Sequence, residues 1–369
     1  MSSEHDRKPL AKRLLRVVDL AGIPVVSVIL AVILSSVIIR LAGFDPFLAF
    51  KALFDGAFGT PRQFGETMMR STPLIFTGLS VAYGFKAGLF NIGAEGQLFM
   101  GGLVAAFLGV SVIGDAWPAL VAVPLILIGA MLIGAAWAFV PAILKAKVGA
   151  HEVITTMMFT FIARYFVDYL VNGPLRAEGS VPQTAAISEP AFLPRLHEIL
   201  PFLPESRWHA GFVVAILAAA AVWFILKYTA LGYENRAVGF NPWASETGGI
   251  SVAATTVKAL CISGALAGLA GASEVMGLYH KLFGQFSAGF GFTGIAVALL
   301  AKNNPIGVIP AAVLFGALSA GAGSMQLNAD VPQDVIFIIQ GLIILFVAAE
   351  GLARWVIGRG RRAVVADAE

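Results

Sequence analysis

The stretch from Ala116 to Leu144 reads AWPALVAVPLILIGAMLIGAAWAFVPAIL and contains no charged residue. A helix needs about 20 consecutive apolar residues to cross the hydrocarbon core of a bilayer. Residues 20–39, 282–301 and 303–329 are equally free of charge. Because backbone polar groups must be paired inside lipid, such stretches are expected to be helical. The sequence therefore predicts an all-α, polytopic membrane protein in contact with membrane lipid.

Composition supports this class and excludes others. Of the 369 residues, 58% are hydrophobic and only 13% are charged, whereas about 25% is typical of soluble domains. The single cysteine, Cys261, rules out a disulfide within the chain. No phosphate-binding glycine loop, zinc-ligand spacing or nucleophile elbow occurs in the sequence. We therefore expect no catalytic residue, no metal, no cofactor on this chain and no nucleic-acid partner.

The charge pattern predicts how the chain is laid out. We expect a cytoplasmic tail over residues 1–19, a membrane domain over 20–354 and a second cytoplasmic tail over 355–369. Placing both termini in the cytoplasm puts the larger share of the 25 lysines and arginines on that side. About ten membrane helices are predicted, over residues 20–42, 67–85, 87–112, 117–143, 152–173, 208–228, 251–276, 288–302, 305–325 and 333–354.

A proline-rich segment over residues 174–207 divides the predicted helices into two groups of five. We interpret it as a crossover loop on the outer side of the membrane. An odd number of helices in each group makes the second group run inverted relative to the first. Two inverted halves are therefore expected, as in many transporters.

Polar side chains at membrane depth are the candidate pathway residues, because they are costly there and tend to face a cavity or a partner. Asn91, Glu95 and Gln97 lie together in a glycine-rich stretch. They predict either a kink that faces solute or a helix crossing held by interhelical hydrogen bonds.

Other candidates for the solute pathway are more scattered. Glu152 follows two lysines and is either a pathway residue or a first-turn residue favoured by the helix dipole. Glu274 is expected near the outer end of its helix, and Phe292 and Thr293 lie in a glycine-rich stretch that can line a route or pack closely. Arg164 and Asp168 are four residues apart and are expected to pair with each other.

Residues 230–250 form a polar, glycine-punctuated loop between two long apolar runs. Asn241 suits a helix N-cap, Pro242 suits the first helical position, and Glu246 falls in or just past the first turn. Gly248 and Gly249 are expected to end this helix after about two turns. The loop is either a docking surface on the cytoplasmic side or a solvated connection.

Several stretches resemble the permease subunits of bacterial ABC importers for nucleosides and simple sugars, within the branched-chain amino acid and ribose permease group. The most specific is Phe-Asn-Ile-Gly-Ala-Glu-Gly-Gln, residues 90–97. Others are Glu-Val-Ile-Thr-Thr-Met-Met at 152–158, Arg-Ala-Val-Gly at 236–239 and Gly-Phe-Thr-Gly-Ile-Ala-Val-Ala at 291–298. The resemblance extends from about residue 65 onward.

The resemblance implies a type II importer-like permease that works as a pair, either homodimeric or heterodimeric. It also implies two cytoplasmic ATP-binding subunits, which carry the ATP, and an extracytoplasmic solute-binding protein. The loop over 230–250 is then similar to the coupling helix that contacts the ATPase, and its coupling residues are Arg236, Gly239, Asn241, Pro242 and Glu246. Phe240 and Trp243 depart from the family's usual residues there, as does His151 beside Glu152.

The function expected from this resemblance is ATP-driven import of a nucleoside or a simple sugar across a bacterial cytoplasmic membrane. A proton-coupled secondary transporter that uses Glu95, Glu152 or Glu274 as a proton carrier is the alternative. A passive channel is a third possibility. The sequence does not identify the solute.

Overall fold

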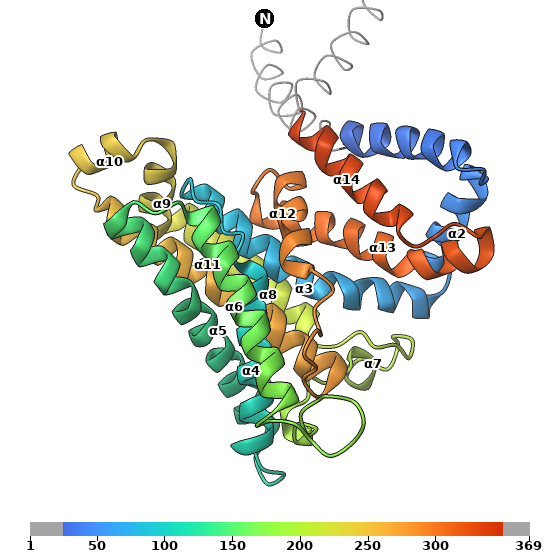
Figure 1. Ribbon diagram of the computed structural model, residues 1–369, viewed down its shortest axis with the longest axis horizontal. Coiled ribbons are helices and arrows are strands. Elements are labelled where there is room, and N and C mark those ends of the chain that lie inside the picture. The colour runs from blue at the N-terminus through green and yellow to red at the C-terminus, as the bar shows by residue number, and fades with distance from the viewer. Residues whose placement is uncertain (1–24, 350–369) are drawn as a thin grey trace, which may run out of the picture. The chain divides into compact units, whose positions relative to one another are not determined.

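The computed structural model describes residues 25–349 and shows a helical protein (Figure 1). The chain forms two compact units, one of residues 55–320 and the other of the residues before 55 together with those after 320. The predicted tails over 1–19 and 355–369 lie outside the described residues.

The larger unit contains all the candidate pathway and coupling residues. Its elements, in chain order, are α3 (Pro61–Lys86), α4 (Ala94–Ser111), α5 (Ala119–Ile143), the π-helix η1 (Leu144–Val148), α6 (Glu152–Asn172), the short 3₁₀ turn η2 (Glu189–Ala191), α7 (Leu196–Ile199), α8 (Gly211–Tyr228), α9 (Ala230–Phe240), α10 (Pro242–Thr247), α11 (Val252–Glu274), the π-helix η3 (Val275–Tyr279) and α12 (Phe290–Leu300).

Helix α11 is the centre of this unit and packs against α3, α4 and α5. The packing is close because glycines face each other. A Cβ added to Gly264 would lie 2.3 Å from the carbonyl oxygen of Gly134 in α5. A Cβ on Gly268 would lie 2.1 Å from the carbonyl oxygen of Ala130. Small residues at such crossings let membrane helices approach closely enough for extensive van der Waals contact.

This packing predicts that Gly→Ala substitutions at two helical glycines change the stability in opposite directions. Changing Gly to Ala in a helix normally stabilises it by up to about 1 kcal/mol. We expect Gly323→Ala to follow this rule, since a Cβ there meets nothing within 4 Å. Gly268→Ala should instead destabilise by about 1–3 kcal/mol, because the new methyl group meets backbone atoms of α5. Thermal unfolding of the two variants in detergent tests this, and a shift in the same direction for both would contradict it.

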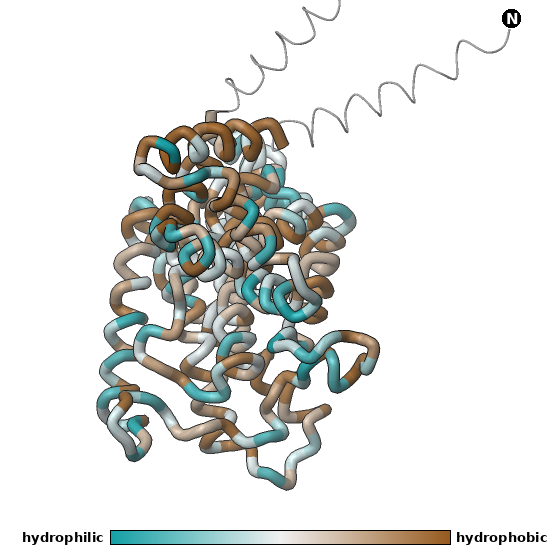
Figure 2. Tube along the Cα trace, turned by 90° about the vertical axis from the view of Figure 1, so that its right-hand side faces the viewer, coloured by the Kyte–Doolittle hydropathy of each residue, from teal (hydrophilic) through white to brown (hydrophobic). Residues whose placement is uncertain are grey.

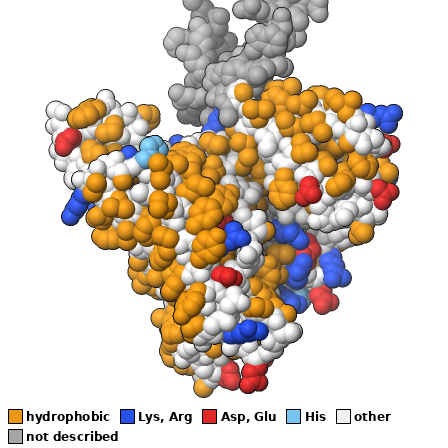
Figure 3. Space-filling view, in the orientation of Figure 1, with side chains coloured by type: hydrophobic (Ala, Val, Ile, Leu, Met, Phe, Trp, Pro, Cys, Tyr) orange, Lys and Arg blue, Asp and Glu red, His pale blue; other side chains and the backbone are white. Residues whose placement is uncertain are grey.

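Six helices in the described residues are long and apolar enough to cross a membrane: α4, α5 with η1, α6, α8, α11 with η3, and α13 (Pro305–Ala329). Within its span α4 is 72% buried, whereas α5 is only 22% buried. Hydrophobic side chains cover much of the visible face over α5 and α6 (Figure 3). Figure 2 shows long hydrophobic stretches along several of the helices. Such apolar exposure suits contact with lipid.

The smaller unit comprises a helix over Val25–Leu41, most of α2 (Pro46–Phe58), the end of α13 and α14 (Val335–Ala348). The Ser27 hydroxyl donates to the carbonyl oxygen of Phe346 at 3.1 Å. Gly321 lies so close to α2 that a Cβ would be 2.3 Å from the Leu53 carbonyl oxygen.

The predicted all-helical, polytopic class is confirmed in the described residues, where six helices are long and apolar enough to cross a membrane. Two details of the predicted layout are wrong. Helix α2 was not predicted, because Lys51 and Asp55 interrupt its apolar sequence. The span predicted from residue 87 begins at Ala94, because Gly88 has a positive φ of 72° and ends the preceding helix.

Candidate functional site

The loop predicted over residues 230–250 contains two short helices, α9 and α10 (Figure 1). As expected, Asn241 is the N-cap of α10 and its side chain accepts from the Ala244 amide at 3.1 Å. Pro242 occupies the first helical position, and the helix ends at Gly248, followed by Gly249 with a φ of 83°. Glu246 lies in the last turn and is exposed.

The surface of α10 is unusually apolar for a solvent-facing helix end. Phe240, immediately before Asn241, is 89% exposed, and Trp243 is 81% exposed. Large aromatic side chains in such positions are typical of protein contact sites. The sequence prediction placed neither residue among the coupling residues, although both were visible as departures from the family pattern.

Helix α9 connects α10 firmly to the end of α3. The buried Asn235 side chain donates to the Tyr83 carbonyl oxygen at 3.3 Å. A Cβ on Gly239 would lie 2.1 Å from the Lys86 carbonyl oxygen, so the two backbones are in direct contact. Arg236 is half-buried. Burial, and to a smaller extent repulsion from Arg236, lowers the pKa of Lys86. A displacement of α9 would therefore be transmitted to the end of α3.

The predicted pathway residue Asn91 lies in the break between α3 and α4, Gln97 lies in the first turn of α4, and both are buried. The Asn91 amide group donates to Gln97 Oε1 at 2.9 Å and to the Ser263 hydroxyl of α11 at 2.8 Å. Ser263 donates in turn to the Ser80 carbonyl oxygen at 2.7 Å. These side chains satisfy one another and join three helices, which corresponds to the interhelical alternative left open by the sequence.

Glu95 is also buried, 4% exposed, and lies in the first turn of α4. Its Oε2 accepts from the amide of Gly291, in the first turn of α12, at 2.6 Å. A Cβ on Gly291 would be 2.3 Å from the Glu95 amide nitrogen, so the first turns of the two helices are in contact. The first amides of a helix have no intrahelical partner and carry partial positive charge. The Glu95 side chain accepts from one of these free amides and also opposes the partial positive charge at the start of α12.

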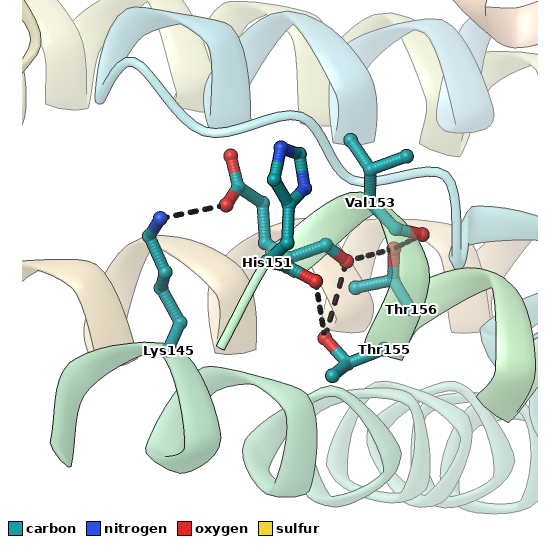
Figure 4. A network of polar contacts seen from close by, with 6 residues as sticks. Lys145, His151, Val153, Thr155 and Thr156 are labelled. Atoms are coloured by element: carbon teal, nitrogen blue, oxygen red, sulfur yellow. Dashed lines mark hydrogen bonds and ion pairs between the residues drawn. The ribbon is translucent and has the colours of Figure 1, made fainter. Parts of the chain in front are cut away.

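Glu152 forms an ion pair with Lys145 of η1, with 2.8 Å between Nζ and Oε2 (Figure 4). The hydroxyl groups of Thr155 and Thr156 donate to carbonyl oxygens in the preceding turn, including that of Glu152 itself. Glu152 therefore has a local partner and sits where the helix dipole favours an acid.

Among the described residues, no hydrogen bond joins the remaining predicted pathway residues to the Asn91 network. Phe292 is 42% exposed and Thr293 is half-buried, both in the first turns of α12. The predicted Arg164–Asp168 ion pair is not formed in the described residues. Asp168 instead accepts from the Asn172 side chain at 3.2 Å, and the charge of Arg164 acts on Glu95.

Glu274 ends α11 and is 1% exposed. The charges of Arg70 in α3 and Arg207 in the segment before α8 act on its carboxyl group. Sequence reasoning missed both arginines as candidates. The sequence does contain a signal for Arg70. It is a charged residue within a long helix that has an apolar face, and it lies four residues after Glu66.

His209, just before α8, is fully buried and its Nδ1 accepts from the Gly211 amide at 3.2 Å. Burial, with a smaller contribution from His280, lowers the pKa of His209 from 6.5 to about 4. Because the folded protein binds this proton less readily than the unfolded chain, stability is highest above pH 6.5 and falls as the pH drops towards 4.

We expect this histidine to lower the free energy of unfolding by roughly 3 kcal/mol across that pH range. Thermal unfolding in detergent at pH 7.5 and pH 4.5 measures the effect, and His209→Gln should reduce the difference between the two midpoints. An unchanged difference in that variant would show that other groups control the acid sensitivity.

The structure is thus a helical protein with several helices suited to crossing a membrane, a buried polar network shared by three of its helices, and a short helix with exposed aromatic residues. The chain matches the family described as branched-chain amino acid transport system / permease component over residues 64–348. It belongs to that family.

Named relatives support the same assignment. The chain is 41% identical to the guanosine ABC transporter permease protein NupP of Bacillus subtilis (strain 168), over 91% of this chain and 95% of the relative. It is 36% identical to the glucose ABC transporter permease protein TsgB13 of Haloferax volcanii, over 91% and 90%. It is 35% identical to the nucleoside ABC transporter permease protein NupB of Lactococcus lactis subsp. cremoris (strain MG1363), over 89% and 90%. No solved structure matches the chain.

Proposed function

We propose that this chain is the permease subunit of an ATP-driven importer of nucleosides, with simple sugars as the second candidate class. Its membership of the permease family and its identity to guanosine and nucleoside permeases support this proposal. The sugar class is supported by the glucose permease relative. ATP is bound and hydrolysed by separate cytoplasmic subunits, and the solute arrives on an extracytoplasmic binding protein.

The proposed mechanism rests on α10. This short helix contains the exposed Trp243, and the exposed Phe240 lies just before its N-cap. In our proposal this helix binds a cleft of the ATPase, and both chain termini face the cytoplasm with it. Arg236 and Gly239 act from α9, while Asn241 and Pro242 define the start of α10. A second permease subunit, identical or related, completes the pathway.

We further propose that the chain contains ten membrane spans in two inverted halves. Reciprocal packing supports this: α11 packs on α4, while α3 packs on α12. In addition, α4 and α12 begin beside each other at Glu95 and Gly291. In inverted-repeat transporters, the N-termini of discontinuous helices typically lie at the interface between the two repeats.

Copurification tests the proposal. An affinity-tagged chain expressed with its neighbouring transport genes should copurify with an ATP-binding subunit, and the purified assembly should hydrolyse ATP. The tagged chain alone should have no ATPase activity. Hydrolysis by this chain without any partner would refute the assignment of ATP to a separate subunit.

A further inference from the structure

Four charged side chains gather at the end of the larger unit opposite α9 and α10. Lys86 marks the end of α3 that contacts α9. Arg70 lies about 24 Å from Lys86 along the helix axis. Glu274 is the last residue of α11, about 33 Å from its start next to α10. Glu66 and Arg207 complete the group, and η3 begins directly after Glu274. Short π-helical segments in membrane helices frequently mark functional sites.

Two of these four charges pair with each other. Arg207 donates from Nε and Nη2 to the two carboxylate oxygens of Glu66, at 2.9 and 2.5 Å. This hydrogen bonding, more than the opposing effect of burial, raises the pKa of Arg207. A two-point contact of this kind fixes the orientation of both side chains. Arg207 and Glu66 therefore hold each other in a fixed orientation at one side of this group of four charges.

The other two charges are not paired directly. Glu274 is almost fully buried, and its Oε1 has no hydrogen-bond partner among the described residues. Arg70 donates from Nη1 to the Ser319 hydroxyl of α13 at 3.2 Å, and a guanidinium group has five N–H donors. The charge of Arg70 acts on Glu274, yet the two form no ion pair in the described part of the chain.

A group that bridges this pair can donate a hydrogen bond to the unpartnered Oε1 of Glu274 and accept one from the guanidinium group of Arg70. A hydroxyl group does both. Two neighbouring hydroxyls, as on ribose or a simple sugar, match the two oxygens of a carboxylate and the planar edge of an arginine.

We propose that Arg70 and Glu274 form a subsite for the vicinal hydroxyl groups of the transported solute, with Ser319 positioning the arginine. This inference rests on the proposed function and refines it, since it assigns the sugar part of a nucleoside to this end of the pathway. Substitutions there should change which solutes pass, beyond any change in how much passes.

The test uses the reconstituted importer with its ATP-binding subunits and binding protein. ATP-driven uptake of guanosine and of 2′,3′-dideoxyguanosine is measured, with the binding protein saturated by each solute. We expect Arg70→Gln and Glu274→Gln each to reduce the preference for guanosine about tenfold, the effect of losing one hydrogen bond to a charged group. Arg62→Gln, an exposed arginine in the same helix, should leave the preference unchanged.

Two milder variants keep the test decisive if either glutamine variant fails to assemble. Arg70→Lys keeps the charge but loses the planar edge, and Ser319→Ala keeps both charges but frees the arginine. Each should lower the preference for guanosine. An unchanged preference in these variants, with guanosine uptake retained, would overturn the subsite. A wild-type importer that takes up neither a nucleoside nor a simple sugar with ATP would instead refute the proposed function.

Discussion

Replacing Phe240 and Trp243 together with alanine is expected to abolish ATP-driven uptake while the membrane fold stays intact. Both side chains are almost fully exposed, so the fold loses little apolar contact. A buried tryptophan at the centre of a protein interface commonly contributes 2 kcal/mol or more to binding, which corresponds to about thirtyfold in affinity. Losing two such aromatic anchors should separate the permease from its ATPase.

The measurement is solute uptake in vesicles that contain the assembled importer, together with copurification of the ATP-binding subunit. Uptake should fall at least about thirtyfold and the subunit should be lost from the purified assembly. Phe202→Ala is the matched control, because Phe202 is 79% exposed and lies in the crossover segment far along the chain from α10. Full uptake by the double variant would show that α10 is a simple connection.

The second large effect is expected at Glu95, where two substitutions separate two mechanisms. Glu95→Ala removes the acceptor of the Gly291 amide and leaves a buried helix start without a partner. The cost is roughly 2–3 kcal/mol, the cost of stranding a buried donor. Glu95→Gln keeps an acceptor oxygen at the same position, so the junction between α4 and α12 should persist.

Uptake and thermal stability are measured for both variants, with Glu178→Ala, an exposed acid, as control. If Glu95 holds two helix starts together, the alanine variant should lose roughly 2–3 kcal/mol of stability and most of its uptake, and the glutamine variant should retain most of both. A proton carrier behaves differently, because glutamine cannot release a proton. Loss of uptake in a stable Glu95→Gln protein would therefore favour the proton-coupled alternative.

The elements that sequence reasoning predicted well depend on local chemistry. The start of α10 at Asn241 and Pro242 and its end at Gly248 follow from residues that are neighbours in the chain. The apolar runs likewise predict helices, because the requirement to pair backbone groups in lipid acts on each segment by itself.

The roles of the polar residues depend on partners that are remote in sequence. Asn91 meets Ser263, which is 172 positions away, and Glu95 meets Gly291, which is 196 positions away. Spacing along one helix predicted that Arg164 would pair with Asp168, yet the described residues contain no ion pair between the two. The sequence could thus identify Asn91 and Glu95 as costly in a membrane, but only the fold shows which groups satisfy them.

The most direct test of the account compares energy sources in one preparation. Vesicles carrying the complete importer and its loaded binding protein are supplied with ATP, with ATP and a protonophore, or with a proton gradient alone, and guanosine uptake is followed. We predict uptake with ATP that the protonophore leaves unchanged, and none with the gradient alone. Uptake driven by the gradient without ATP would contradict a permease whose energy comes from a separate ATPase bound at α10.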